Sequence, residues 1–323
     1  MADLVAIGEL LIDFTPAGTN SDGALLFARN PGGAPANVLA MATKLGASTA
    51  LIGKVGNDSF GAYLKEVLHN YHIDDQFVYT DPNAFTTLAF VQLNQQGERS
   101  FSFSRKPGAD TLLRSEEIPH SLIDTCKIFH FGSLSLTNDP AKSATYAALS
   151  YAKQQRKLIS YDPNYRPLLW QDADTARTEM LRALPYADVV KVSDEELTFL
   201  TNRTDLLSGA EQLAAYGAKL VLVSLGADGS FFYTRNHCGI VPAFKVRAVD
   251  TTGAGDAFFG SVLRQLILRM DQDLTALSES QLKEILLFAN AAGSLTTTRF
   301  GAISGLPTKE EIANLLTQTE QNA

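Results

Sequence analysis

Short apolar segments alternate with amphipathic ones along most of this chain, and this alternation constrains its fold more than any other feature. The segments expected to be β-strands are residues 4–14, 48–55, 127–131, 158–162, 188–192 and 219–225. Apolar residues recur at helical spacing in residues 35–45, 60–71, 141–154, 193–200, 254–269 and 281–298. Such alternation predicts a mostly parallel sheet with helices on both faces, an α/β fold.

Nothing in the sequence divides the chain. It contains no linker rich in Pro, Gly and Ser and no internal repeat, so we expect a single domain over residues 1–323. Near the C-terminus, Thr308 and Glu311 have the spacing of a capping box and predict a final helix.

One segment departs from the strand–helix pattern. Residues 86–105 form two short runs around the turn NQQG, and Phe101 and Phe103 alternate there with serines. This spacing predicts a β-hairpin with one apolar face. Inside an alternating chain, the hairpin is an insertion that can cover a site.

The charge and cysteine content narrow the class of protein. The net charge is −8 and no Lys/Arg run interrupts the acidity, which argues against a nucleic-acid or anionic-membrane partner. The two cysteines, Cys126 and Cys238, indicate a reducing compartment. The first apolar run carries Glu9 and lacks a basic start, so it predicts a buried strand instead of a signal peptide. We therefore expect a cytoplasmic protein.

The stretch DTTGAGD, residues 250–256, places a single carboxylate directly behind small residues. It matches neither the dinucleotide fingerprint nor the P-loop. Gly253, Ala254 and Gly255 lead into a predicted helix, whose N-terminus can form an anion hole for a phosphate. Asp256 can then accept the proton of an attacking hydroxyl. The alternative is a glycine turn followed by an ordinary first-turn acid.

A second small-residue region supports the phosphate interpretation. Gly32 and Gly33 precede another predicted helix and allow close approach of a polar ligand. Asn37, in the first turns of that helix, can donate to and accept from hydroxyls. Taken alone, this region also fits a glycine turn with Asn37 as a capping residue. The two regions together are far more specific than either one.

The combined motifs resemble those of the PfkB (ribokinase-like) sugar kinases. The resemblance rests on GGAPAN, GKVGNDSFG and DTTGAGDAFFG and extends over nearly the whole chain. GELLIDF, TTLAFVQL, FSRKPGAD, DPNYRPLLW and KVSDEELTFL resemble the fructokinases in particular. The resemblance implies a three-layer sandwich with a small β-lid, formed by segments of about residues 14–31 and 84–106.

The resemblance also assigns roles around the acceptor. It implies that Asp256 is the catalytic base, with Gly253, Ala254 and Gly255 as the anion hole. Asp13, at the end of the first predicted strand, matches an acid that binds sugar hydroxyls; alternatively it is a strand-end turn acid. The residues implied in substrate binding are Asp13, Gly32, Gly33, Asn37, Phe101, Phe103, Arg105 and Arg166.

For several of these residues a structural role stays open. Arg166 follows the strand 158–162, where α/β ligands bind, so it can hold the transferring phosphate or the substrate. It also fits a surface turn made by Pro163 and Asn164. Phe101, Phe103 and Arg105 would face the sugar from the lid strand, although Phe101 or Phe103 can equally belong to the packing face of the hairpin.

On the nucleotide side the resemblance implies ATP, Mg²⁺ and a potassium-like ion. Ser193 stands where the family has Asn, and Glu196 keeps its match as an orienter of Mg²⁺-bound water; Glu195 is the neighbouring alternative. Both acids can also be solvated helix residues, and the ANAAG run can be close helix packing. The remaining implied positions are Ser224, Gly226, Gly229 and Asn290 for the nucleotide, and Asp250, Thr252, Thr296, Arg299 and Gly301 for the monovalent cation, mostly through backbone oxygens.

The implied activity is that of an ATP-dependent sugar kinase, with fructokinase as the first expectation and fructose 6-phosphate as the product. Kinases of ribose, a 2-keto-3-deoxy sugar acid or a nucleoside are the alternatives. A sugar-binding regulator without chemistry is disfavoured by the intact Asp256 loop. The exposed edge of the hairpin can also pair with a second copy, which would give a homodimer.

Overall fold

A ten-stranded sheet forms the middle layer of the computed structural model, which describes residues 2–93 and 99–321. The order of its main path is β14-β13-β12-β11-β10-β9-β1-β4-β5, and β6 pairs with β4. The strands are β1 Leu4–Ile7, β4 Thr49–Gly56, β5 Ile73–Asp74, β6 Val78–Asp81, β9 Ile128–Gly132, β10 Leu158–Asp162, β11 Val189–Ser193, β12 Leu220–Ser224, β13 Ser230–Tyr233 and β14 Cys238–Val241. Among the described strands of this sheet, only the pairings β12–β13 and β13–β14 are antiparallel, which confirms the mostly parallel arrangement.

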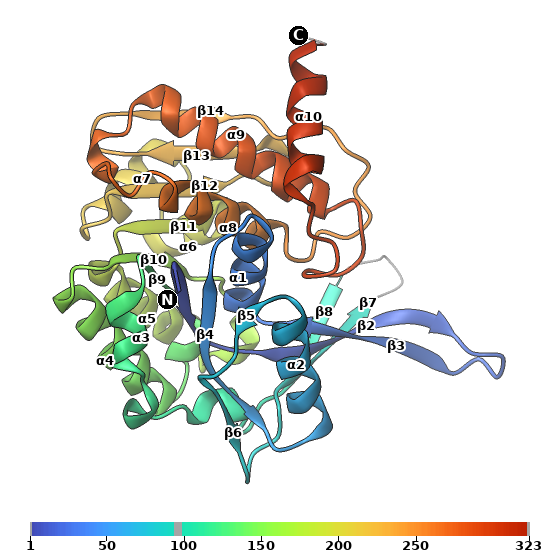
Figure 1. The fold of residues 1–323 in the computed structure, drawn as a ribbon. Helices are drawn as coiled ribbons and strands as arrows, with labels where there is room; N and C mark the ends of the chain where they lie inside the picture. Colours follow the sequence, from blue (N-terminus) through green and yellow to red (C-terminus); the bar gives the residue numbers. More distant parts are fainter. Residues whose placement is uncertain (1, 94–98, 322–323) are drawn as a thin grey trace.

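Helices cover both faces of the sheet (Figure 1). Buried residues of each face form a core with one group of helices, so the structure is a three-layer sandwich. The helices of one group are α1 Ala34–Lys44, α2 Ser59–Asn70, α8 Ala254–Ile267, α9 Glu279–Thr296 and α10 Lys309–Gln321. Those of the other are α3 His120–Thr125, α4 Ala141–Gln154, α5 Ala173–Ala183, α6 Asp194–Thr201 and α7 Leu206–Ala214.

The predicted capping box at the start of α10 is present. The Thr308 N–H donates to Glu311 Oε2 at 2.7 Å, and the Glu311 N–H donates to Thr308 Oγ1 at 3.2 Å. Two of the helix N-terminal N–H groups thus find partners, as the pattern requires.

A second sheet of four strands lies beside the sandwich. Its order is β3-β2-β7-β8, with β2 Leu11–Thr19, β3 Leu25–Gly32, β7 Leu88–Leu93 and β8 Arg99–Ser104. The predicted hairpin is therefore present as β7 and β8, and β2 and β3 extend it. Figure 1 shows β2 and β3 reaching away from the body as a long ribbon. Phe14 and Phe90 stack on each other with 5.1 Å between ring centroids and join β2 to β7.

The first predicted strand is wrong in one respect. Residues 4–14 do not form one strand, because the chain leaves the central sheet after β1 and enters the second sheet as β2. Gly8 makes this change of direction possible: its φ is 157°, and a Cβ there would lie 2.6 Å from Pro35 Cγ. Asp13 consequently lies within β2 and does not end the first strand.

Candidate active site

The N-terminus of α8 is built by the DTTGAGD stretch. Gly253 is the N-cap residue with φ 78°, and a Cβ there would lie 2.6 Å from the Ala302 Cβ, so only glycine fits. The helix begins at Ala254, and the first N–H groups of a helix have no partner within it. Asp256 lies in this first turn and is buried. The carboxylate therefore lies in the same turn as the first N–H groups of α8, of which that of Ala254 donates to the Thr251 carbonyl at 3.3 Å.

Asp256 is held by a residue from the other glycine region. The Asn37 Nδ2 donates to Asp256 Oδ2 at 2.8 Å. Burial raises the pKa of Asp256, while the Asn37 hydrogen bond and the charge of Lys191 oppose the increase. The Asn37 Oδ1 is buried and has no partner among the described residues. Asn37 thus orients the carboxylate and keeps one acceptor available for a ligand.

Lys191 was not predicted as a site residue, although it is the only charged side chain in the apolar strand β11. Its Nζ lies 3.0 Å from Asp162 Oδ2, and both side chains are buried. A Cβ on Gly255 would lie 3.1 Å from this Nζ, which places the ammonium group against the start of α8. Burial by itself lowers the pKa of Lys191, but the carboxylates of Asp162, Glu196 and Asp256 outweigh it and raise the pKa. Lys191 therefore stays cationic beside the first turn of α8.

Asp13 faces the same region from β2. It is half-buried, and burial raises its pKa to about 6, with Arg166 opposing and Asp256 adding to the increase. Gly32, on the neighbouring strand β3, leaves the space that the Asp13 carboxylate occupies, because a Cβ there would overlap Asp13 Oδ2. Gly32 therefore affects the site indirectly, because it leaves room for the Asp13 carboxylate.

These groups line one cavity of about 620 Å³ between the second sheet and the start of α8. It collects the predicted residues Asp13, Gly33, Asn37, Phe103, Arg166, Asp250, Thr252, Gly253, Gly255, Asp256 and Gly301. Further residues of its wall were not predicted: Glu9, Asn30, Leu134, Asn164, Lys191 and Phe300. An acid with a positioned amide, a buried cation and a helix N-terminus at one cavity can bind a hydroxylated substrate and stabilise a transferring phosphoryl group.

Comparison with known proteins identifies the family. Residues 1–309 match the model of the pfkB family carbohydrate kinases. The chain is 44% identical over 316 residues to "Probable fructokinase-3" of Arabidopsis thaliana, covering 97% of this chain and 91% of that protein. The chain belongs to the pfkB family of carbohydrate kinases.

Solved structures of this family have the same fold. The fructokinase of Xylella fastidiosa with bound ATP superposes with a TM-score of 0.91 at 34% identity, covering 99% of this chain and all of that one. A double mutant of the Vibrio cholerae O395 fructokinase, in a form with fructose, ADP and potassium ion bound, gives a TM-score of 0.87 at 35% identity, with 98% of each chain covered. The predicted ribokinase-like α/β fold is confirmed.

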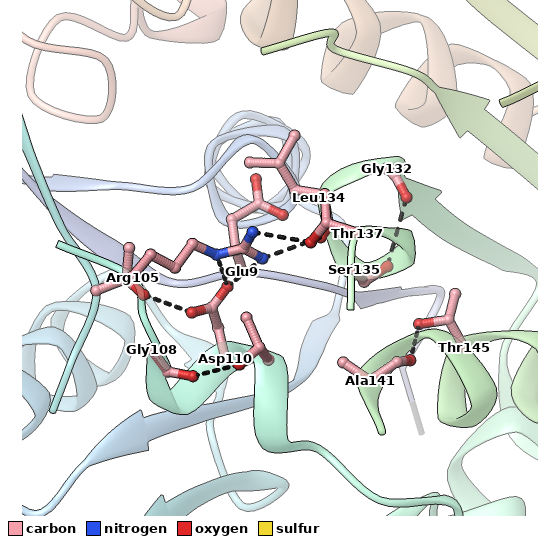
Figure 2. Close-up of polar contacts among 12 residues, drawn as sticks. Glu9, Arg105, Gly108, Asp110, Gly132, Leu134, Ser135, Thr137, Ala141 and Thr145 are labelled. Atoms are coloured by element: carbon pink, nitrogen blue, oxygen red, sulfur yellow. Dashed lines mark hydrogen bonds and ion pairs between the residues drawn. The ribbon is translucent and has the colours of Figure 1, made fainter. Parts of the chain in front are cut away.

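For Arg105 the structure of this pfkB kinase differs from the prediction. Arg105 is buried and does not line the cavity; its Nη2 lies 2.7 Å from Asp110 Oδ2 (Figure 2). Its Nη1 donates to Thr137 Oγ1 and its Nη2 to the Leu134 carbonyl, both at 2.9 Å. The residue follows β8 instead of lying in it, so its side chain turns into the body. Phe103 does line the cavity, and the side chain of Phe101 lies outside the described part of the chain.

Two of the residues predicted on the nucleotide side lie at the ends of neighbouring strands, and Asn290 lies within α9. Ser193 and Ser224 are register partners at the carboxyl ends of β11 and β12. Ser193 and Glu196 form the capping box of α6, and Glu196 Oε1 also accepts from the Tyr165 N–H at 2.6 Å. Asn290 donates to the carbonyls of Val241 and Pro242. These bonds agree with the alternative that the ANAAG run serves close packing.

The positions predicted for a monovalent cation form one loop cluster. Asp250 accepts from the Gly301 N–H through Oδ2 and from the Thr252 N–H through Oδ1, each at 3.0 Å. A Cβ on Gly305 would lie 2.5 Å from the Gly301 carbonyl oxygen and 3.2 Å from that of Thr296. Two carbonyl oxygens thus converge on the space that glycine leaves. Such backbone oxygens suit a hard monovalent cation.

The described part of the chain has neither a cluster of metal-ligating side chains nor a helix that could cross a membrane. Among residues 2–93 and 99–321, no three His, Cys, Asp or Glu side chains form a group that could hold a metal. Within the same described ranges, no helix has both the length and the apolar character needed to cross a membrane.

Proposed function

We propose that this pfkB kinase is a fructokinase that transfers the γ-phosphoryl group of ATP to the 6-hydroxyl of fructose. The observation that carries the proposal is the carboxylate of Asp256, which lies in the first turn of α8 and accepts a hydrogen bond from Asn37. The fructokinase relatives support fructose as the acceptor sugar.

Asp256 removes the proton of the acceptor. Its Oδ2 is held by Asn37, and its Oδ1 accepts no hydrogen bond from the described residues, so Oδ1 can take the hydroxyl proton. The sugar oxygen then attacks the γ-phosphorus, the bond to the bridging oxygen breaks, and ADP leaves with that electron pair. A loose transition state makes positioning and charge stabilisation more important than the strength of the base.

Positive groups stabilise the phosphoryl group during transfer. The start of α8 contributes N–H donors, and Lys191 contributes a cation held by Asp162. Arg166 lines the same cavity and acts electrostatically on Asp13 and Asp256. This arrangement places positive charge on the side of the cavity where the anion hole lies.

Mg²⁺ fits the residues present because it commonly binds through one or two carboxylates together with substrate phosphates. Glu196 and Asp162 are the carboxylates that would hold it, directly or through water. Asp162 Oδ2 lies 3.0 Å from Lys191 Nζ, and Glu196 lies in the first turn of α6, directly after the strand β11 that carries Lys191. When bound, Mg²⁺ would neutralise phosphate charge.

A monovalent cation is proposed at a separate place. Asp250, Thr296 and Gly301 would hold K⁺ through backbone oxygens and so stabilise the neighbouring anion-hole loop.

The second sheet serves as the lid in this proposal. Its residues Leu11, Asp13 and Val91 line the cavity, so closure of the sheet would exclude water that competes as acceptor.

The edge strand β3 exposes Leu25, Leu26 and Phe27, which supports pairing of two lids in a homodimer. Light scattering behind size exclusion tests the dimer: a monomer at micromolar concentration contradicts it. From the composition, we also propose a cytoplasmic location.

A sugar panel with ATP tests the function. Fructose, ribose, a 2-keto-3-deoxy sugar acid and a nucleoside are compared by ADP release, and ³¹P NMR locates the phosphate on the product. We expect the highest kcat/KM for fructose and a 6-phosphate. A higher kcat/KM for ribose or the nucleoside would reassign the substrate. Sugar binding without ADP release would favour a regulator.

A further inference from the structure

Glu9 extends a row of alternate side chains that faces the cavity. Leu11, Asp13 and Thr15 lie on one side of β2 and line the cavity, as alternate residues of a strand do. Glu9 precedes β2 by two residues and lines the same cavity. Glu9 has no part in the phosphoryl transfer proposed above.

The carboxyl group of Glu9 has one oxygen in use and one without a partner. Glu9 is only 3% exposed, and its Oε1 accepts from the Ala34 N–H at 2.9 Å. This bond replaces a side-chain cap at the start of α1, where the N-cap residue Gly33 has none. Glu9 Oε2 is buried and finds no partner among the described residues. A buried oxygen without a partner is costly, so it needs an explanation.

The neighbouring protein groups do not use this oxygen. Figure 2 shows Glu9 beside the Arg105–Asp110 pair. The Arg105 Nε donates to Asp110 Oδ2 at 2.8 Å, and Nη1 and Nη2 donate to Thr137 and Leu134. Every nitrogen of the guanidinium therefore has another partner. Burial raises the pKa of Glu9 to about 7, and the backbone N–H groups of Glu9 and Ala34 offset part of this increase, with a smaller contribution from Arg105; both protonation states are therefore accessible at neutral pH.

Glu9 and Asp256 belong to different parts of the cavity wall. Glu9 is bound by the Ala34 N–H at the start of α1 and lies beside Arg105 and Leu134 (Figure 2), whereas Asp256 lies in the first turn of α8 and is bound by Asn37. Leu134, whose carbonyl binds Arg105, also lines the cavity near this end. The part of the sugar that meets Glu9 is therefore remote from the hydroxyl that reacts.

We propose that Glu9 is a specificity-determining residue whose free carboxyl oxygen forms a hydrogen bond with a sugar hydroxyl at the end of the sugar remote from Asp256. For fructose reacting at C6, this is a hydroxyl at C1 or C2. The inference rests on the proposed function. A site that pairs a specific hydroxyl strongly disfavours analogues without it, because its own polar group is left unsatisfied.

The experiment pairs one variant with analogues that lack one hydroxyl. Glu9→Gln keeps an oxygen for the Ala34 N–H and replaces the free oxygen by an amide. Wild type and Glu9→Gln are assayed with fructose, 1-deoxyfructose and 2,5-anhydromannitol, which lacks the C2 hydroxyl. Glu179→Gln is the matched control, because this partly buried acid of α5 contacts Lys142 and Tyr146 outside the cavity.

We expect Glu9→Gln to lower kcat/KM for fructose about 10- to 100-fold, with the KM for ATP unchanged. For one of the two analogues, wild type and Glu9→Gln should agree within about threefold, because the interaction is already missing. A purely structural role would instead give the same loss for fructose and both analogues, and that result would overturn the proposal, as would an unchanged kcat/KM for fructose.

A failure of the proposed function is recognised separately. If wild type does not phosphorylate fructose, the sugar assignment is wrong, and the same comparison is made with the best sugar of the panel and its deoxy analogues. If wild type phosphorylates fructose but the Glu9→Gln loss is the same for every analogue, the kinase assignment holds and the inference on Glu9 fails.

Discussion

The Asn37 amide donates a hydrogen bond of 2.8 Å to the carboxylate of Asp256, although 219 positions separate the two residues in the chain. This bond joins the small-residue turn before α1 to the first turn of α8. Because Asn37 Oδ1 stays available to a ligand, one side chain can bind the sugar and orient the base. The orientation of Asp256 is thereby linked to the loop proposed to contact the acceptor.

Replacing Asp256 by Asn tests the base directly. The amide is nearly isosteric and cannot take the hydroxyl proton, so kcat should fall ~10²–10⁴-fold. ATP binding, measured by calorimetry, and the melting temperature should change little. Activity within a few-fold of wild type would remove Asp256 from the mechanism.

The pH dependence should report the buried carboxylates. Burial raises the pKa of Asp256 from its ordinary value of 3.8 and that of Asp13 to about 6. Both must be ionised to accept from hydroxyls, so kcat/KM should fall as the pH decreases through about 6. In Asn37→Asp, a second carboxylate replaces the amide donor and should raise the pKa of Asp256 further. The acidic limb should then move to higher pH, and an unmoved limb would contradict the role of Asn37.

Sequence reasoning located the two loops of the site because their signals are local. Glycines before a helix and a first-turn acid are visible in the chain itself, and Gly253 and Asp256 lie where they were predicted. Lys191 was missed because its pairing with Asp162 depends on two strands lying side by side. Arg105 was misplaced because its partner Asp110 lies beyond the predicted hairpin. Longer-range partners of this kind need the folded structure.

Lys191 should matter for catalysis as well as for stability. Lys191→Met removes the cation beside Gly255 and leaves Asp162 buried without its partner, so both kcat and stability should fall. In the double variant with Asp162→Asn, much of the stability should return, since no unpaired charge remains. The kcat should stay reduced by at least ~10²-fold, because the cation is still missing and a carboxylate that would hold Mg²⁺ is now an amide. Recovery of kcat in the double variant would mean that Lys191 is only structural.

A potassium-like ion should increase the activity. At fixed Mg²⁺ and ionic strength, K⁺ should give a higher kcat than tetramethylammonium, which is too large for the loop of Asp250, Thr296 and Gly301. Gly305→Ala should reduce this difference, because its Cβ would lie 2.5 Å from the Gly301 carbonyl oxygen. Equal rates in the two salts would exclude a functional cation at this loop.

Arg105 should stabilise the fold instead of binding the sugar. Its guanidinium pairs with Asp110 in a buried position, and Asp110 also accepts from Thr87 Oγ1 at 2.5 Å. Arg105→Ala leaves the Asp110 carboxylate buried and unpaired, which should cost about 3–5 kcal/mol in the free energy of unfolding. Urea denaturation measures this loss, and the double variant with Asp110→Ala should recover part of it. If Arg105 bound the sugar directly, Arg105→Ala would raise the KM for fructose without this loss of stability. We expect instead that Arg105→Ala causes a large loss of stability. Any increase in the fructose KM should be smaller in the double variant than in Arg105→Ala.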